Sequence, residues 1–279
     1  MRSKFGLAGV LMPLLLAPAL PCFAGEPLPD VSTLLRQVER NQERLEQERE
    51  KYSFSDIEEQ DDLSRDDKVK RKTVHEYDVF FLHGYLVRRL VEKDGKALSA
   101  SAQKKEDARV RKLVEKYERK AEKKSRPDDD GVGIAAFLRA SRFTHPRWTG
   151  LAGRLVLEFD FEPNPNYRPK TFVERVVHTL SGEMWADAQA GEVVRLQARF
   201  DRSFRIDGGL LASLEKGTSV IAEQMLVGGS VWMPSYTSIH ASGRLFLIKS
   251  ERLNVTDRYS DYRIFHVESL SKIAPPAKP

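Results

Sequence analysis

Residues 172–200 read FVERVVHTLSGEMWADAQAGEVVRLQARF, and this stretch predicts two β-strands joined by a tight turn. Gly191 supplies the turn, because glycine adopts positive φ without steric cost. Beyond the turn, apolar and polar side chains alternate: Val194, Leu196, Ala198 and Phe200 are separated by Arg195, Gln197 and Arg199. Strict alternation is typical of a strand with one buried and one solvated face. We therefore expect this hairpin at the centre of an antiparallel sheet.

Segments on both sides of the hairpin extend the same plan. Residues 154–162, RLVLEFDFE, alternate cleanly between apolar and charged side chains, and residues 70–82 and 85–93 form a strand pair about His83-Gly84. Further strands are expected from residue 52 and over 203–214, 218–227, 231–240, 245–248 and 259–265. A turn is expected at Ser242-Gly243, and one or two helical turns over 134–140. A helix is expected over 31–51, capped by Asp30 or Ser32. The predicted fold class is α+β, with about ten strands in a large curved antiparallel sheet, since wide sheets twist.

A second helix is expected over residues 99–125, where Lys, Glu and Arg dominate. Val110, Leu113, Val114 and Tyr117 keep helical spacing within it. One interpretation is a solvated helix that rests a narrow stripe on the domain. The alternative is a basic helix that binds a membrane surface or a partner, although its acidic residues weaken the membrane option.

The N-terminus has the pattern of a secretory signal peptide. Arg2 and Lys4 precede an apolar run from about residue 5 to residue 20, and small residues around Ala24 suit cleavage after it. The run is shorter than the roughly 20 residues that span a bilayer. A lipid anchor at Cys22 is the less favoured alternative, because Pro21 stands where such a signal has a small residue. We expect a periplasmic protein.

Charge and cysteine content exclude several classes of protein. Loss of Arg2 and Lys4 with the signal peptide lowers the formal net charge from +5 to +3, so the basic composition is a poor argument for nucleic-acid binding. Cys22 is the one cysteine of the chain, so the mature protein is expected to have no disulfide and no thiol nucleophile. Its stability must then come from an apolar core.

No motif for catalysis or metal binding stands out. Ser-x-x-Lys occurs three times without the motifs that accompany it in serine acyltransferases, and Gly-x-Ser-x-Gly is absent. The six histidines are scattered singly, and Asp128, Asp129 and Asp130 lack the glutamate of a calcium loop, because Phe137 stands at its position. We expect no enzyme, no cofactor and no metal.

The remaining candidate is apolar surface on the inner face of the sheet. Such a face either packs into a filled core or lines a groove for an acyl chain or another apolar ligand. The candidates for this face are Leu155, Leu157, Phe159, Phe161, Leu196, Phe200, Met225, Trp232, Phe246 and Ile248. The sequence leaves both interpretations open.

The central hairpin also carries a family resemblance. Gly182-x-x-Trp185-x-Asp187, the turn at Gly191 and Val194-Arg195-Leu196 resemble the hairpin of the LolA/LolB-like periplasmic lipoprotein-carrier superfamily, which includes RseB-like relatives. The opening helix and the closing stretch 259–265 are similar as well. The match looks closer to the poorly characterised secreted LolA-like proteins, with residues 99–131 as a charged helical insertion. The resemblance implies an incomplete β-barrel whose concave face is covered by helices and shelters acyl chains or a protein segment.

These observations predict a monomeric, non-catalytic periplasmic binding protein. Its expected ligand is a lipid or the acyl chain of a lipoprotein, held in the concave face of the sheet by apolar burial. The alternative is an envelope-stress or signalling module of the RseB type that binds an envelope protein. The expected organisation is a signal peptide over 1–24, a leader over 25–30, one domain over 31–266 and a disordered tail over 267–279, with at most transient membrane contact and no nucleic acid.

Overall fold

The structure is a computed structural model that describes residues 27–123, 134–206, 212–245 and 251–264. The expected signal peptide with Cys22, the Asp-rich stretch 128–130 and the expected tail 267–279 lie outside the described residues. So do Phe246 and Ile248, two of the candidate ligand-binding residues.

The described residues form four helices and thirteen strands. The helices are α1 (Val31–Arg49), α2 (Ala100–Glu122), α3 (Ile134–Ala140) and α4 (Phe172–Val177). The strands are β1 (Tyr52–Leu63), β2 (Val69–Leu82), β3 (Tyr85–Lys93), β4 (Lys96–Ala97), β5 (Ser141–Leu151), β6 (Arg154–Pro163), β7 (Leu180–Asp187), β8 (Glu192–Phe200), β9 (Phe204–Ile206), β10 (Ala212–Leu214), β11 (Ser219–Val227), β12 (Val231–Leu245) and β13 (Glu251–Ile264).

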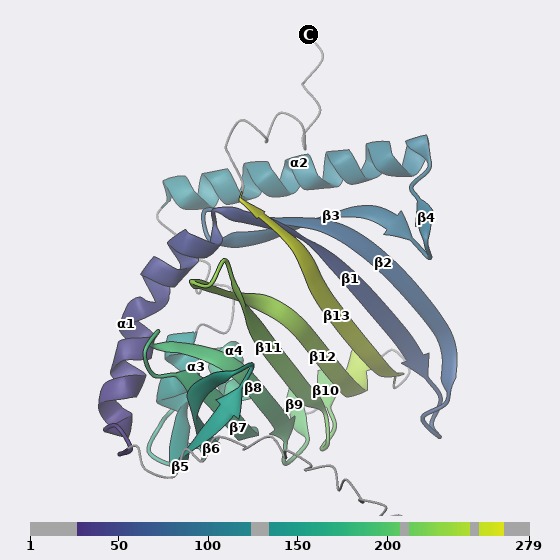
Figure 1. The fold of residues 1–279 in the computed structure, drawn as a ribbon. Coiled ribbons are helices and arrows are strands. Elements are labelled where there is room, and N and C mark those ends of the chain that lie inside the picture. The colour runs from purple at the N-terminus through teal and green to yellow at the C-terminus, as the bar shows by residue number, and fades with distance from the viewer. Residues whose placement is uncertain (1–26, 124–133, 207–211, 246–250, 265–279) are drawn as a thin grey trace, which may run out of the picture.

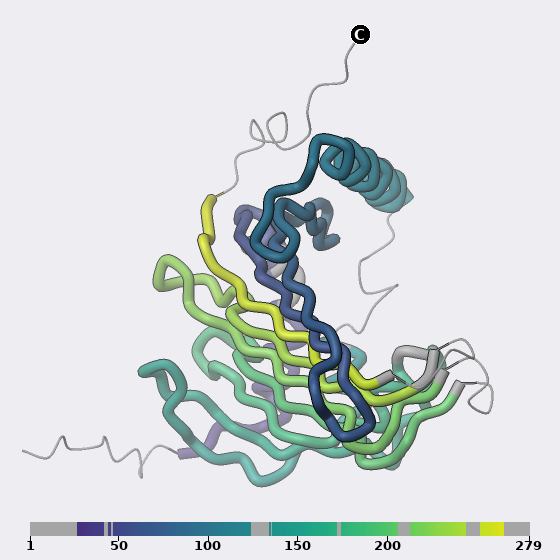
Figure 2. The backbone as a smooth tube through the Cα atoms, turned by 90° about the vertical axis from the view of Figure 1, so that its right-hand side faces the viewer, coloured from purple at the N-terminus to yellow at the C-terminus, as the bar shows by residue number. Residues whose placement is uncertain are grey.

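All thirteen strands belong to one antiparallel sheet. Its main path runs β4-β3-β2-β1-β13-β12-β11-β8-β7-β6-β5, and the short strands β9 and β10 join it beside β12. The sheet bends along this path, and its two edges do not pair with each other (Figures 1 and 2). The expected fold class, a curved antiparallel sheet that stays open and carries a few helices, is confirmed.

The largest apolar cluster lies where three helices cover one face of strands β5–β8. Leu157 and Phe159 of β6 are fully buried in it, against Leu34 and Val38 of α1. α3 and α4 close the same space (Figure 1), through Phe137, Leu138, Ala140 and Val177. We call this side of the sheet the helix-covered face, and the opposite side the outer face.

Helix α2 packs on the outer face at the other end of the sheet. Its buried residue Val110 contacts Phe80 of β2 and Val87 of β3. Successive side chains of a strand point to opposite faces, so these two point away from Val79, which belongs to a separate cluster with Phe54. Figure 1 shows α2 lying across the top of the molecule, over β3. The apolar stripe expected in residues 99–125 thus rests on the sheet.

The central hairpin is confirmed from residue 180, but its expected start is wrong. Residues 172–177 form helix α4, and Thr171 and Glu174 close a capping box at its N-terminus. β7 and β8 then pair as expected around Gly191, which has φ 62°. Gly182 serves a close approach, because a Cβ there would lie 1.9 Å from the carbonyl oxygen of Gln197.

Two other expectations about strands are corrected. The turn expected at Ser242-Gly243 does not exist, because β12 runs through it, and a Cβ on Gly243 would meet the carbonyl oxygen of Ser213 in β10 at 2.0 Å. Glycine is therefore needed there to let β10 approach, not to make a turn. β5, which the sequence analysis does not predict, forms the edge of the sheet beside β6.

Candidate functional site

Four of the predicted ligand-binding residues come together beneath the helices. Leu157, Phe159 and Phe161 belong to the helix-covered cluster, and Leu196 packs against it from β8. The phenyl rings of Phe159 and Phe143 lie edge to face, with centroids 6.1 Å apart. The space between the sheet and the helices is therefore occupied by side chains in this conformation.

The other predicted residues do not share this cluster. Trp232 packs with Val156, which alternates with Leu157 along β6 and so belongs to the outer face. Met225 is 43% exposed, whereas Phe200 is buried and Leu155 is half-buried. The residues predicted for one inner face thus do not all lie on the same side of the sheet, since Trp232 is on the outer face.

Helix α1 is attached to the sheet by a small polar network at its C-terminal end. Arg49 forms an ion pair with Glu192 of β8 and donates hydrogen bonds to Gln224 Oε1 at 2.8 Å and to the carbonyl oxygen of Trp232 at 3.1 Å. Burial raises the pKa of Glu192 to about 7, although Arg49 acts against this shift. Midway along the helix, Asn41 Nδ2 donates to the carbonyl oxygen of Ala190 at 2.9 Å. Strands β8, β11 and β12 therefore all bind Arg49 at the C-terminal end of α1.

The helix-covered face continues beyond the helices into the second half of the sheet. Cross-strand partners of an antiparallel sheet point to the same face. Starting from Leu196 of β8, the register passes through Ala222 of β11, Thr237 of β12 and Asp257 of β13 to Glu58 of β1. The face that is apolar under α1 is thus acidic at β13 and β1.

A guanidinium group bridges three carboxylates on this part of the face. Arg88 of β3 lies 2.5 Å from Asp56 Oδ2, 2.9 Å from Glu58 Oε2 and 3.1 Å from Asp257 Oδ1. Asp56 is 1% exposed, and burial raises its pKa to about 7; burial also raises the pKa of Asp257. We call these four residues the Arg88 cluster. The cluster is not among the predicted sites, because its members come from three strands that are distant in the sequence.

Aromatic side chains surround the Arg88 cluster. The Arg88 guanidinium stacks 4.0 Å from the ring centroid of Tyr77, and Phe54 lies at the centre of an apolar group with Val79 and Met233. Five half-buried aromatic side chains pack against this apolar group, and we call them the aromatic patch: Tyr52, Tyr77, Phe81, Tyr259 and Tyr262. Burial raises the pKa of Tyr77 and of Tyr259 to about 12, so both phenols stay neutral at physiological pH.

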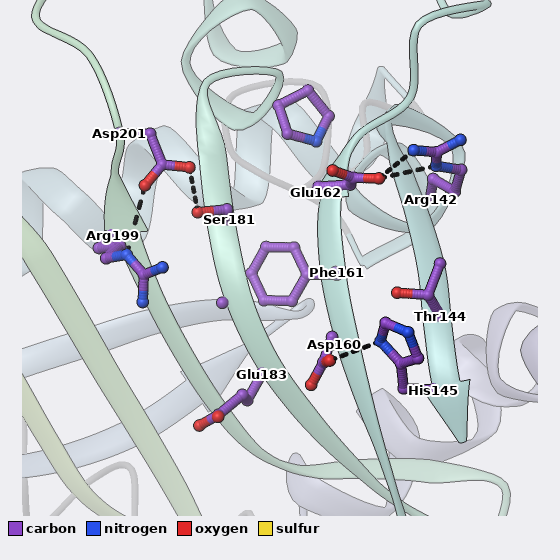
Figure 3. Close-up of a pocket in the computed structure, with 12 residues that line it drawn as sticks. Arg142, Thr144, His145, Asp160, Phe161, Glu162, Ser181, Glu183, Arg199 and Asp201 are labelled. Atoms are coloured by element: carbon purple, nitrogen blue, oxygen red, sulfur yellow. Dashed lines mark hydrogen bonds and ion pairs between the residues drawn. The ribbon is translucent and has the colours of Figure 1, made fainter.

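The outer face of strands β5–β8 carries a polar groove of about 730 Å³ (Figure 3). Its charged side chains pair with one another. Arg142 pairs with Glu162, and His145 Nδ1 lies 2.8 Å from Asp160 Oδ2. His145 sits at a bulge of β5 with φ 51°.

This groove contains serine, histidine and aspartate, but they are not arranged for nucleophilic catalysis. The Ser181 hydroxyl donates to Asp201, and Asp201 also contacts Arg199. In Figure 3, Ser181 and His145 lie on opposite sides of Phe161. A serine nucleophile requires a base within hydrogen-bond reach, and Ser181 is directed to a carboxylate instead.

The described residues contain neither a metal-binding group of side chains nor a helix that could span a membrane. Within residues 27–123, 134–206, 212–245 and 251–264, no three His, Cys, Asp or Glu side chains gather where they could hold a metal ion. None of the helices in the same ranges is long and apolar enough to span a bilayer.

Comparisons with known proteins found a distant structural likeness. No protein-family model matches the sequence, and no curated protein matches it. Among solved structures, the chain is similar to the crystal structure of MucB in complex with the periplasmic part of MucA, at 12% identity and a TM-score of 0.23. The match covers 85% of this chain and 100% of the other.

Proposed function

We propose that the protein is an exported, non-catalytic binding protein that shelters a lipid or lipoprotein acyl chain between the sheet and helix α1. One observation carries this proposal: Leu157, Phe159, Phe161 and Leu196 line one apolar face. Its cover includes helix α1, whose polar attachment to the sheet rests on two side chains, Arg49 and Asn41. Displacement of α1 would exchange Leu34 and Val38 for a ligand of the same apolar character. Each buried methylene of an acyl chain contributes about 0.8 kcal/mol.

The closed conformation sets the apparent affinity. When only a fraction of the molecules has α1 displaced, the apparent dissociation constant rises by the inverse of that fraction. The hydrogen bonds of Arg49 favour the closed state, and bonds that involve a charged group contribute roughly 1.5–3 kcal/mol each. A weaker attachment of α1 should therefore give tighter ligand binding.

Replacement of Arg49 by alanine is expected to increase the affinity for a fluorescent fatty-acid probe by about tenfold or more, the factor that corresponds to about 1.4 kcal/mol. Titration of the purified protein with the probe measures this. The matched control is Arg36→Ala on the same helix, because the exposed Arg36 side chain donates its hydrogen bonds to Ser32 and Thr33 of α1 itself. The double variant Arg49→Ala/Glu192→Gln avoids an unpaired buried carboxylate and should bind the probe as tightly as the single variant. Unchanged affinity in both Arg49 variants would contradict the proposal.

A second function is favoured by the aromatic patch, namely the binding of a protein partner. Tyrosine and arginine are enriched at the energetic centres of protein interfaces, and here Arg88 stacks on Tyr77, one of the half-buried tyrosines of the patch. Leu86 is 41% exposed and pairs with Phe81 of the patch, so it faces the same side. Ile57 is 36% exposed and alternates with Asp56 and Glu58, so it faces the outer side.

A photo-crosslinking residue at position 86 is expected to capture one discrete envelope protein in cells, whereas the same residue at position 57 should not. The physical reason is that the two positions have similar exposure but lie on opposite faces of the sheet. Capture at position 86 should fall when Phe81 is replaced by alanine, and immunoblotting of the crosslinked species measures this. Equal capture at both positions, or capture that is insensitive to Phe81, would count against an interface at the aromatic patch.

A further inference from the structure

The exposed side of helix α2 is strongly basic over residues 100–114, about the first two thirds of the helix. Between residues 100 and 114, every exposed charged side chain is a lysine or an arginine. Four of them make no ion pair with the described residues, and we call them the basic stripe: Lys104, Lys105, Arg111 and Lys112. At about 100° per residue, they lie on the side of α2 opposite Val110 and Tyr117.

The two acidic residues within residues 100–114 of α2 face the sheet and bind to strand β3. Glu106 accepts a hydrogen bond from the backbone N–H of Leu90 at 2.8 Å, and Asp107 pairs with Arg89 at 2.9 Å. The Glu106 and Asp107 side chains are only 12% and 16% exposed. Within residues 100–114 the acidic side chains are therefore turned toward the sheet and the basic ones outward, whereas Glu115, Glu118 and Glu122 in the C-terminal part of α2 are exposed.

Helix stability does not account for this arrangement. A helix N-terminus carries positive partial charge, which favours acidic side chains nearby. The first turn of α2 contains no acidic residue, and the helix begins with the neutral cap Ser99. The positive potential of the helix end thus adds to that of the basic stripe instead of being compensated.

We propose that the basic stripe of α2 docks the protein on an anionic phospholipid surface. The stripe lies along a straight helix about 35 Å long, and Figure 1 shows this helix at the periphery of the molecule. Its outward side has Ala108 between the charged residues and no large apolar side chain. A protein interface is centred on buried aromatic or apolar anchors, which this side lacks. Lipid headgroups need only charge, and each Lys or Arg near an anionic surface contributes about 1 kcal/mol.

The contact is expected to be peripheral and reversible. The apolar residues of α2 face β2 and β3, with Tyr117 stacked on Tyr85 at 4.3 Å between ring centroids. They are not available for insertion among the acyl chains, which distinguishes α2 from an amphipathic helix that lies within the membrane interface. Binding should therefore depend on headgroup charge and be screened by salt.

Sedimentation with lipid vesicles tests this proposal on the chain from Gly25 onward. We expect binding to vesicles of phosphatidylglycerol and phosphatidylcholine at about 50 mM salt, and loss of binding at about 500 mM salt or with phosphatidylcholine alone. The variant with all four stripe residues changed to glutamine should bind at least tenfold more weakly. The matched control changes four exposed basic residues elsewhere to glutamine and should bind like the wild type: Lys68, Lys70, Arg202 and Lys216.

Three results would overturn the proposal. The wild type could fail to bind phosphatidylglycerol vesicles, or the control variant could lose as much binding as the stripe variant, which would indicate a general charge effect. Binding of polyglutamate through the same four residues, without vesicle binding, would assign the stripe to an acidic polypeptide instead. Circular dichroism of both variants checks that the fold is unchanged, which is expected because the altered side chains are exposed.

Discussion

Replacement of Phe159 by alanine is expected to lower the free energy of unfolding by about 3–5 kcal/mol, the usual cost of truncating a buried phenylalanine. Phe159 is 0% exposed and lies where β6 meets the side chains of α1 and α3. Its phenyl ring also contacts that of Phe143 edge to face. Removal of the ring leaves a cavity that the surrounding strands cannot close, because their backbones are fixed by the sheet. Urea denaturation followed by circular dichroism measures the change.

Met225 provides the matched control for this experiment. It was predicted together with Phe159 to line the inner face, but its side chain is 43% exposed. Met225→Ala should change the free energy of unfolding by only about 0.5 kcal/mol or less. A loss below about 1 kcal/mol for Phe159→Ala would mean that the helices do not pack tightly on β6, and that the space beneath them is already open.

The sequence predicted the fold best where one face of a strand is buried and the other is charged. In β6, Leu157 and Phe159 are buried, while Glu158 and Asp160 face the polar groove side with Arg147. Such alternation has a period that only a strand satisfies. Alternation does not reveal what covers the apolar side, however, and therefore it could not distinguish a filled core from a groove.

The errors have local physical causes. Residues 172–177 are rich in β-branched side chains and so predict a strand, yet the capping box of Thr171 and Glu174 starts a helix there. That signal was readable in the sequence. β5 was missed because Pro146 and a bulge between Thr144 and Arg147 interrupt its alternation.

The Arg88 cluster could not be predicted, because its members are brought together by strand register. Asp56 and Glu58 of β1 meet Arg88 of β3 and Asp257 of β13, and no short motif links these segments. The available signal was weak: Arg88 stands in the apolar run YLVRRLV, where a buried arginine requires anionic partners. The same dependence makes the cluster sensitive to the loss of its arginine.

Replacement of Arg88 by methionine is expected to lower the free energy of unfolding by about 3–5 kcal/mol at pH 8, the cost of breaking a buried ion pair by removing one partner. Methionine retains apolar contact with Tyr77 but removes the guanidinium from three carboxylates. The exposed pair of Arg71 and Asp62 gives the control, since Arg71 is 71% exposed and Arg71→Met should cost about 1 kcal/mol or less.

The pH dependence of this loss identifies its cause. In the wild type, the pKa of Asp56 is about 7 in the folded protein and about 4 in the unfolded chain. Between these two pH values the folded protein keeps the Asp56 proton, whereas the unfolded chain has released it. The contribution of Asp56 protonation to stability is therefore complete below about pH 4 and is lost as the pH rises through about 7. Without Arg88 the carboxylates of Asp56 and Asp257 should bind protons still more readily, because the guanidinium that lowers their pKa is gone. The destabilisation by Arg88→Met should thus be clearly smaller at pH 5 than at pH 8, and Asp56→Asn should restore part of the stability at pH 8. An equal loss at both pH values would show that Arg88 acts through packing on Tyr77 and not through its charge.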